Sequence, residues 1–551
     1  MIKHTQTKPF QRFPKIEQVV REEYESGREP RMSENFGMRV EPQRVMATGR
    51  VLEPCKVVYG GHNAQYKPND KGSWNLRNVQ FTKPMSARWA MVVCVEDQKF
   101  DTSDVKDFIG TLNQVAQERD MRLGAPVGRY PIYAKRVIDQ AKDRSREGLF
   151  EKFLTDEVRR LESENANDLR GEPIGLLVAV MGDTAGENGK YIYPALKRWS
   201  HSMSGIPVQC CQYSKALFVN KGNNKKNMAN DKQYFAGLLL KMNLKLGGEN
   251  CYAITPERVG DRDAGIDLMM KETSGQGTMV VGLDVHHASP GSQGASYAAL
   301  VATLDQRCVK VRTIVTTQEM LDDPNGGSRK QRQEIVLTLE ESMQTLLHDY
   351  RMANQCLPRR IIFFRDGVAH NQFEAVAEQE IEAVRRACRS LQHMPIQLVF
   401  IVTQMRTRAR LATDRQGRLD NVECGTVVDR DITGAGTFEF YMQPHHALIG
   451  SGRVSHYHVL ENDCRFTPDE VQRFAFDLCH LYQRATKIVS RPVHLYYAHL
   501  AAALGPYYDA SYKERDGNWD VGSTSSHGSH GSGSSSAAEL HPTMKNRVYY
   551  A

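Results

Sequence analysis

Two patterns of hydrophobic positions follow one another along the chain. Between about residues 78 and 255, short apolar runs alternate with amphipathic stretches of helical period. Such alternation predicts strands and helices in turn, and therefore a doubly wound α/β domain whose ligands bind at the carboxyl ends of parallel strands. The expected strands are Trp89–Val95, Gly175–Met181 and Pro207–Tyr213, and the expected helices are Thr102–Arg119, Gly148–Ser163, Lys190–Ser200 and Ala229–Leu244.

From about residue 278 the pattern changes to three consecutive strands, then a helix and a further strand. This order is that of an RNase H-like fold, so the whole chain is expected to be α/β. The expected strands are Met279–Val285, Ser296–Leu304, Cys308–Thr316, Arg360–Arg365 and Gln397–Thr403, and the expected helices are Lys330–Asp349 and Asn371–Cys388.

Two aspartates stand at the ends of buried strands in this second region. Asp284 and Asp366 each end an apolar run, so their carboxylates are expected to project from the sheet edge. Two carboxylates on neighbouring strands can share a divalent cation, and oxygen ligands with a phosphate substrate favour Mg²⁺ or Mn²⁺. The alternative is that each Asp only caps the following loop or helix, and the pattern leaves both interpretations open.

The ends of the chain are less regular. Residues 1–75 are polar, with one amphipathic stretch at Lys15–Ser26, and they predict a linker that packs on other domains. Ser511–Pro542 includes a Gly/Ser/His-rich run, which predicts a disordered insertion; a solvated loop is favoured over a metal site at its histidines. The longest apolar run, Ile174–Gly182, has the length of a buried strand and not of a membrane span.

Composition adds little to this picture. The 551 residues suffice for two to four domains, and 72 Lys and Arg against 65 Asp and Glu give a net charge of +7. That excess fits a nucleic-acid partner without requiring one. Eleven cysteines without a CxxC pair indicate reduced thiols in the cytoplasm, with the nucleus as the alternative, and argue against a zinc site. The N-terminus lacks the apolar core of a secretory signal.

Several segments, in one order, resemble motifs of the eukaryotic Argonaute family. GSWNLRNVQF (72–81) and LLLKMNLKLGG (238–248) are similar to its MID domain. Its PIWI domain is resembled by 282–291 (GLDVHHASPG), 361–373 (IIFFRDGVAHNQF), 400–411, 424–433, 455–460, 465–472 and 491–500 (RPVHLYYAHL). The motifs cover nearly the whole chain, which most resembles a fungal quelling-pathway Argonaute. This resemblance implies a linker at 1–75, a Rossmann-like MID domain at 76–260 and an RNase H-like PIWI domain at 261–551, with the family's N and PAZ domains missing before residue 1.

The resemblance also implies a metal-dependent RNA endonuclease. The family's catalytic tetrad falls on Asp284, Glu334, Asp366 and His499, and Asp284, Asp366 and His499 are the implied ligands of Mg²⁺ or Mn²⁺. Glu319 is a rival for Glu334. Loop residues precede Glu334, so without guide and metal its carboxylate is expected to lie outside the cluster of the other three. The expected reaction is cleavage of a target RNA paired to a guide; the alternative is a guide-loaded scaffold that recruits silencing partners without cutting.

Further residues are implied to hold a small guide RNA. Lys241 and Lys245 are four positions apart on an expected helix, so both ammonium groups share one face. The implied contacts of the guide 5′-phosphate are Tyr193, Lys197, Gln209, Lys241 and Lys245, and those of the guide backbone are Arg406, His445, Arg453, Tyr482 and Arg484. Met405 and Leu504 stand where relatives carry basic residues, so part of the phosphate charge is expected to be met by the C-terminal region or by a cation.

Overall fold

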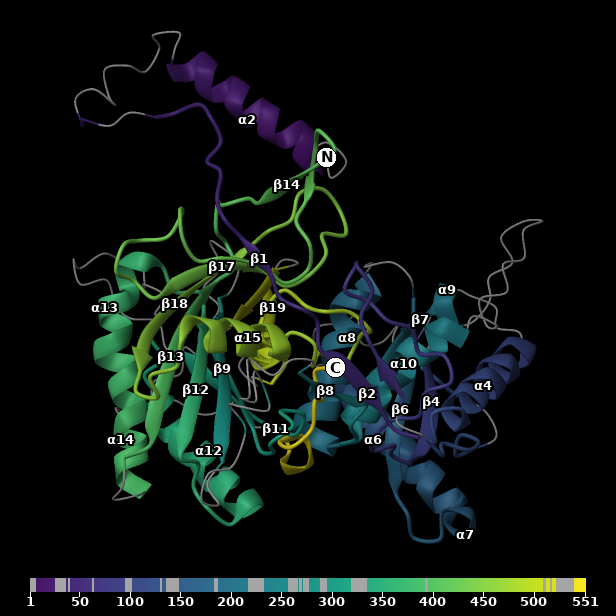
Figure 1. Cartoon of the computed structure of the whole chain (residues 1–551). Coiled ribbons are helices and arrows are strands. Elements are labelled where there is room, and N and C mark those ends of the chain that lie inside the picture. Colours follow the sequence, from purple (N-terminus) through teal and green to yellow (C-terminus); the bar gives the residue numbers. More distant parts are fainter. Residues whose placement is uncertain are drawn as a thin grey trace.

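Two sheets, lying side by side, organise two halves of the protein (Figure 1). In the described part of the chain, no helix is long and apolar enough to cross a membrane. The computed structural model describes residues 6–24, 36–37, 40–61, 64–94, 102–128, 131–134, 148–182, 187–216, 232–255, 266, 270, 277–287, 295–318, 334–391, 395–508, 512–515, 518–521 and 540–551.

The first sheet has four parallel strands in the order β5-β4-β6-β7. Its strands are β4 (Arg88–Cys94), β5 (Ile132–Tyr133), β6 (Ile174–Met181) and β7 (Val208–Gln212). Alternate strand residues face opposite sides, so α4 and α10 bury their apolar faces on one side of the sheet, and α6 and α8 on the other. The helices are α4 (Thr102–Gln117), α6 (Leu149–Glu164), α7 (Ala166–Leu169), α8 (Glu187–Arg198), α9 (Tyr213–Ala216) and α10 (Lys232–Lys245). The expected doubly wound α/β domain is confirmed.

The large sheet has nine strands in the order β1-β16-β17-β18-β13-β12-β9-β10-β11. Strands β9 to β11 form an antiparallel meander, and β12 returns parallel to β9, which confirms the expected RNase H-like order. The strands are β9 (Thr278–His286), β10 (Ser296–Thr303), β11 (Val311–Gln318), β12 (Arg360–Asp366), β13 (Gln397–Gln404), β16 (Thr426–Val428), β17 (Glu439–Gln443) and β18 (Ser455–Asn462).

Helices cover both faces of the large sheet. α12 (Leu339–Asn354) and α14 (Glu382–Leu391) pack on one face. α16 (Val493–Leu504) packs on the other, and α15 (Pro468–Leu478) belongs to the same core cluster. A Cβ on Gly282 of β9 would lie 2.3 Å from the main-chain carbon of His494, so the absence of a side chain lets α16 approach the sheet closely.

Three expectations need correction. The helix expected from Lys330 begins at Leu339, and 330–333 lie outside the described residues. The single helix expected at Asn371–Cys388 is divided into a 3-10 turn, α13 (Phe373–Val376), a π-turn at Ala377–Ile381 and α14. Inside the segment expected to be disordered, β19 (Tyr512–Arg515) pairs with β20 (Asn518–Val521); 522–539 lie outside the described residues.

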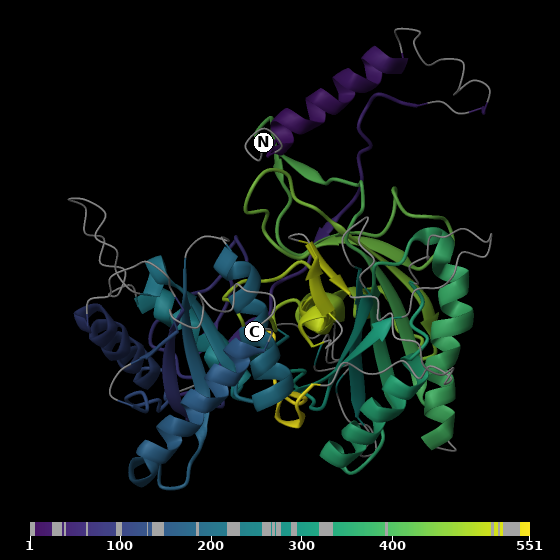
Figure 2. The same cartoon turned by 180° about the vertical axis from the view of Figure 1, so that it is seen from behind.

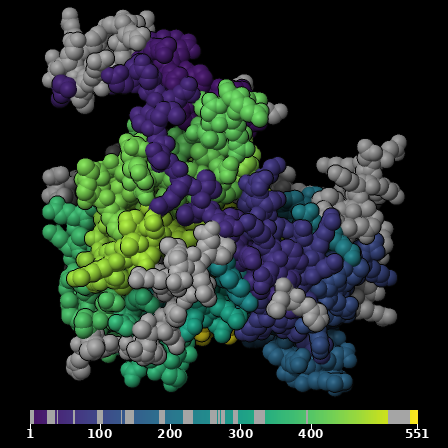
Figure 3. Space-filling view, viewed as in Figure 1, coloured from purple at the N-terminus to yellow at the C-terminus, as the bar shows by residue number. Residues whose placement is uncertain are grey.

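The N-terminal segment joins both halves. Its helix, α2, spans Pro9–Tyr24 where Lys15–Ser26 was expected, and it projects from the body (Figures 1 and 3). Farther along, β1 (Arg50–Val51) pairs with β16 at the edge of the large sheet. β2 (Lys56–Tyr59) then pairs with β3 (Gln65–Tyr66) and with β8 (Cys251–Ile254).

The last described segment, 540–551, runs between the two halves (Figure 2). The ring of Tyr549 lies 5.0 Å from that of His201, which follows α8. The ring of Tyr550 lies 5.4 Å from that of Tyr497 on α16, and its hydroxyl lies 3.3 Å from Thr313 Oγ1 on β11. These buried contacts tie the first sheet's helices to the large sheet.

Candidate active site

Asp284 and Asp366 come together at the carboxyl ends of two neighbouring parallel strands. Arg365 pairs with Leu283 in the β12–β9 ladder, so the next residue on each strand is an aspartate. Each carboxylate is buried and has one oxygen fixed by the main chain. Val285 N donates to Asp284 Oδ1 at 2.9 Å, and Gly367 N donates to Asp366 Oδ1 at 2.8 Å.

The second oxygen of each aspartate faces a basic side chain. His499 Nδ1, on α16, lies 2.7 Å from Asp284 Oδ2. Arg491, just before α16, donates through Nη1 to Asp366 Oδ2. Burial raises the pKa of Asp366 to about 6; Arg491 opposes this rise, and the charge of Asp284 adds to it. Arg491 therefore supplies positive charge beside a pair of carboxylates that repel each other.

Glu334 lies beside this pair, across Gly367. An ideal Cβ on Gly367 would be 3.0 Å from Glu334 Oε1 and 4.0 Å from Asp284 Oδ1. Glu334 Oε2 is 2.8 Å from His287 Nε2, and Oε1 is 3.6 Å from Arg365 Nη1. Within the described residues, no hydrogen bond joins its carboxylate to Asp284, Asp366 or His499. Its movement on binding of guide and metal stays a prediction.

Arg365 fixes the main chain on either side of this centre. The side chain is fully buried and donates to the main-chain oxygens of Glu334 at 2.6 Å and of Asp366 at 2.5 Å. Its charge is met by Glu380 of the π-turn, at 3.0 Å. A buried ion pair in the core thus positions two of the four expected catalytic residues.

The donor set fits a hard divalent cation. Oxygen ligands suit Mg²⁺ and Mn²⁺, and the two buried carboxylates stand on neighbouring strands. Asp284 and Asp366 would hold the cation, with His499 beside Asp284. Within the described residues, no three of the four tetrad side chains bring ligand atoms within 4.8 Å of one another.

One group with that spacing does occur in the described structure, away from the expected centre. Glu439 on β17 and His456 and His458 on β18 bring their ligand atoms within 4.8 Å. Glu439 Oε2 is 3.0 Å from a nitrogen of each histidine, and His458 Nε2 is 3.1 Å from His456 Nδ1. His458 and Arg365 both pair with Val402 of β13, so this group lies on the face of the sheet opposite to Asp366.

A second site lies along β7, the edge strand of the first sheet, where basic side chains converge. Lys245 of α10 donates to Gln209 Oε1 at 2.8 Å and to Val208 O at 3.1 Å. The ammonium of Lys197, on α8, lies 5.4 Å from the centre of the Tyr193 ring. Gln209, Lys241 and Arg484 line a cavity of about 1270 Å³.

The charges in this pocket repel one another. Burial lowers the pKa of Lys245 well below its usual range, and Lys197, Arg484 and Lys241 lower it further. Burial likewise lowers the pKa of Lys197 and of Lys241. In the described structure no carboxylate is among the groups that shift these pKa values. A bound anion would relieve this repulsion.

The expected backbone contacts fall into two places. Arg484 and Tyr482 stand at the pocket: the guanidinium lies 5.9 Å from the Tyr482 ring, and the Arg484 charge lowers the pKa of all three lysines. Arg406 and Arg453 are exposed on the large-sheet half. His445 there has a buried Nδ1 without a hydrogen-bond partner in the described structure, and burial lowers its pKa to about 4.

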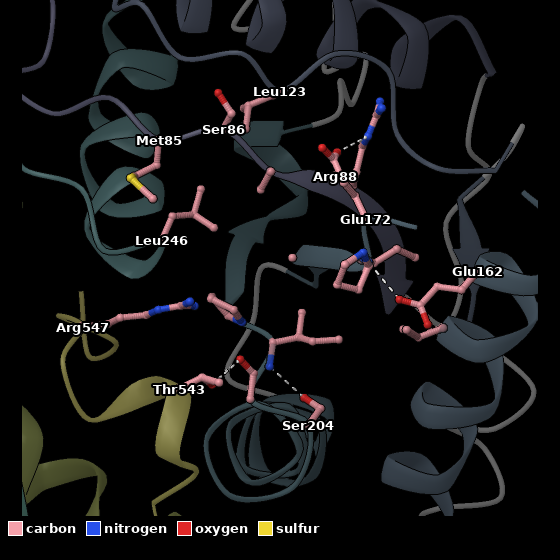
Figure 4. A pocket seen from close by; sticks show the side chains of 18 of the residues that line it. Met85, Ser86, Arg88, Leu123, Glu162, Glu172, Ser204, Leu246, Thr543 and Arg547 are labelled. Atoms are coloured by element: carbon pink, nitrogen blue, oxygen red, sulfur yellow. Dashed lines mark hydrogen bonds and ion pairs between the residues drawn. The ribbon is translucent and has the colours of Figure 1, made fainter. Parts of the chain in front are cut away.

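Another large cleft, of about 1180 Å³, lies at the amino ends of strands of the first sheet (Figure 4). It is lined by residues that begin strands, including Arg88 and Ile174. Arg88 donates to Glu172 at 3.1 Å, and Ile174 N donates to Glu162 at 2.9 Å. Arg88 and Glu172 are therefore paired with each other, and the cleft lies where the strands begin, whereas α/β sheets bind ligands where strands end.

Two family profiles match the chain. The family profile described as "Piwi domain" matches residues 184–509, more than half of the chain, and "Mid domain of argonaute" matches 67–137. The chain belongs to the Argonaute family. It consists of a MID–PIWI lobe, in which the first sheet is the MID sheet and the large sheet is the PIWI sheet. The division at residues 76 and 261 stays a prediction.

Solved structures with the same fold include other Argonautes. The lobe is similar to the Argonaute of Kluyveromyces polysporus with a guide RNA, at 20% identity and a TM-score of 0.74, over 100% of this chain and 61% of that one. It is also similar to the C-terminal lobe of a budding yeast Argonaute, at 20% identity and a TM-score of 0.69, over 91% of this chain and 95% of that one. Drosophila Piwi is similar at 18% identity and a TM-score of 0.67, over 100% of this chain and 63% of that one. The chain thus spans under two thirds of the Kluyveromyces and Drosophila proteins.

Several residues of this Argonaute lobe were missed by sequence reasoning. Arg365 and His287, which hold Glu334, lie within the motifs FFRDG and GLDVHH. Their closeness in sequence to the expected cation ligands Asp366 and Asp284 could have marked them as candidates. Arg491 opens the motif RPVHLYYAHL but carries no periodic signal. Glu380 could not be found, because an acidic residue in an amphipathic helix reads as solvent-exposed.

Proposed function

We propose that this lobe holds a small guide RNA by its 5′-phosphate and hydrolyses RNA paired to that guide. The observation that carries the proposal is the convergence of Asp284, Asp366 and His499, from three separate segments, on one end of the PIWI sheet. The buried lysines of the MID half form a separate anion site, as the binding of a guide end requires. Glu334 completes the catalytic set.

Each residue has a distinct task. Asp284 and Asp366 would hold a divalent cation, which would supply activation of water and stabilisation of the leaving oxygen. Asp284 orients the imidazole of His499 through Nδ1. His287 and Arg365 hold Glu334 beside the aspartates. In the MID pocket, Lys197, Gln209, Lys241, Lys245 and Arg484 bind the phosphate, and Tyr193 stacks on the first base.

A guide-loaded scaffold that recruits silencing partners without cutting is the second candidate. It is favoured by one observation, the ion pair of Arg491 with Asp366, which occupies an oxygen that a cation would use. Both candidates place the protein in RNA silencing, in the cytoplasm or the nucleus.

Cleavage with a loaded guide separates the two candidates. The 551-residue chain is loaded with a 5′-phosphorylated guide and mixed with complementary RNA, in Mg²⁺, in Mn²⁺ or with EDTA. We expect cutting with either ion and none with EDTA. Asp366→Ala should abolish cutting and keep guide affinity within a few-fold. Cutting by that variant would refute the assignment, and guide binding without any cutting by the unaltered chain would favour the scaffold.

A further inference from the structure

Arg491 is a basic residue in direct contact with an expected cation ligand, Asp366. It belongs to the short connection before α16, and its Nη1 donates to Asp366 Oδ2. The side chain is only 13% exposed. Because the other oxygen of Asp366 accepts from Gly367 N at 2.8 Å, Arg491 faces the oxygen that the main chain leaves free.

The guanidinium cannot withdraw by losing its proton, since arginine stays charged in proteins. A divalent cation on the same carboxylate would therefore lie next to a fixed positive charge. Like charges a few ångströms apart in a partly buried site repel strongly. The cation and Arg491 cannot both keep full contact with Asp366.

Few other contacts hold Arg491 in place. Its Nε is buried without a hydrogen-bond partner in the described structure, and its guanidinium lies 5.4 Å from the ring of Tyr496. The preceding residue is better fixed, because Ser490 O accepts a hydrogen bond from Ser455 Oγ at 3.0 Å. The connection is thus anchored, while the side chain itself is retained mainly by Asp366 and an aromatic face.

We propose that Arg491 competes with the divalent cation for Asp366, so that the cation binds only when the guanidinium is displaced. This inference rests on the proposed function, because it takes Asp284 and Asp366 as the cation site. Because the guanidinium must first be displaced, a higher concentration of free cation is needed to fill the site. The phosphates of a paired guide and target offer Arg491 an alternative anionic partner, which would link loading of the groove to completion of the centre.

The test measures cation binding directly, without cleavage. The full chain, free of RNA, is titrated with Mn²⁺, and bound ion is followed by electron paramagnetic resonance. Arg491→Met removes the charge and keeps an apolar side chain of similar reach; we expect the affinity for Mn²⁺ to rise roughly tenfold or more. Arg491→Gln, a polar second variant, should give a rise in the same direction. Arg491→Lys keeps the charge and should stay near the unaltered affinity.

Asp366→Asn distinguishes failure of this inference from failure of the proposed function. If Asp366→Asn loses Mn²⁺ while Arg491→Met and Arg491→Gln bind it no more tightly than the unaltered chain, the competition is refuted and the cation site stands. If Asp366→Asn binds Mn²⁺ as well as the unaltered chain, the cation site itself is refuted, and the competition with it.

Discussion

Replacing Glu380 should destabilise the protein strongly, because its partner Arg365 would keep an unpaired charge in the core. Neither side chain has exposed surface, at 0% each. Glu380 accepts from Arg365 Nε at 3.0 Å and from Arg365 Nη2 at 3.1 Å. Removing one partner of such a buried pair costs about 3–5 kcal/mol, so Glu380→Ala should lower the free energy of unfolding by about that amount.

A double variant separates charge from packing. Arg365→Met alone leaves the Glu380 carboxylate unpaired and should cost a similar amount, so independent effects would sum to about 6–10 kcal/mol. The combination of Arg365→Met and Glu380→Ala removes both charges of this buried pair. Its loss comes from main-chain groups, chiefly the oxygens of Glu334 and Asp366, at about 1–3 kcal/mol each. We therefore expect the double variant to be more stable than the sum of the single variants predicts.

Urea denaturation followed by tryptophan fluorescence measures these differences. Glu378→Ala, on the same turn but exposed, is the matched control and should change stability by less than about 0.5 kcal/mol. A loss below about 1 kcal/mol for Glu380→Ala, or simple additivity in the double variant, would refute the reasoning. Guide-directed cleavage should stay low in the double variant even where stability recovers, since Glu334 has lost its main-chain support.

Other perturbations test the pocket and the helix contact. Replacing Lys241 and Lys245 together with Ala should weaken a 5′-phosphorylated guide at least about tenfold more than a 5′-hydroxyl guide in filter binding, and equal losses would show that the lysines contact only the backbone. Burial lowers the pKa of Lys245, so the unfolded chain binds more protons than the folded chain, and stability rises with pH below the usual lysine pKa. A bound phosphate should raise the pKa of Lys245 again, so binding should take up protons. Calorimetry in buffers of different ionisation enthalpy should detect this uptake. Identical heats in those buffers would exclude it. Gly282→Ala should cost roughly 1–3 kcal/mol in thermal unfolding by pushing α16 off β9, whereas Gly237→Ala, with open space, should not; equal melting temperatures would refute the close contact.

The strands could be predicted from the sequence because burial on both faces makes each a continuous apolar run. Met279–Val285 and Arg360–Arg365 were expected and appear as β9 and β12, each extended by a residue or two. Asp284 and Asp366 could be identified as well, because a polar residue at the end of an apolar run can be recognised in the sequence alone.

Interactions between distant segments could not be predicted in this way. Before α12, Arg365 and Glu380 hold the main chain of Glu334 and Val336, and periodicity does not show these contacts. The π-turn at Ala377–Ile381 inserts an extra residue into the helical repeat and turns Glu380 inward, against its polar character. Arg491 and Asp366 are 125 positions apart, and nothing local to either residue announces their contact.

The N-terminal segment limits how far the two halves can separate. Only four residues lie between β1, held on the PIWI sheet, and β2, held on β8 of the other half, so this stretch can extend to about 18 Å at most. Leu52 N already donates to Gly425 O, and Cys55 N donates to His480 Nε2 at 3.2 Å. The segment is therefore a short tether that joins the two halves. Separating the two halves further would first break the pairing of β1 with β16 or of β2 with β8.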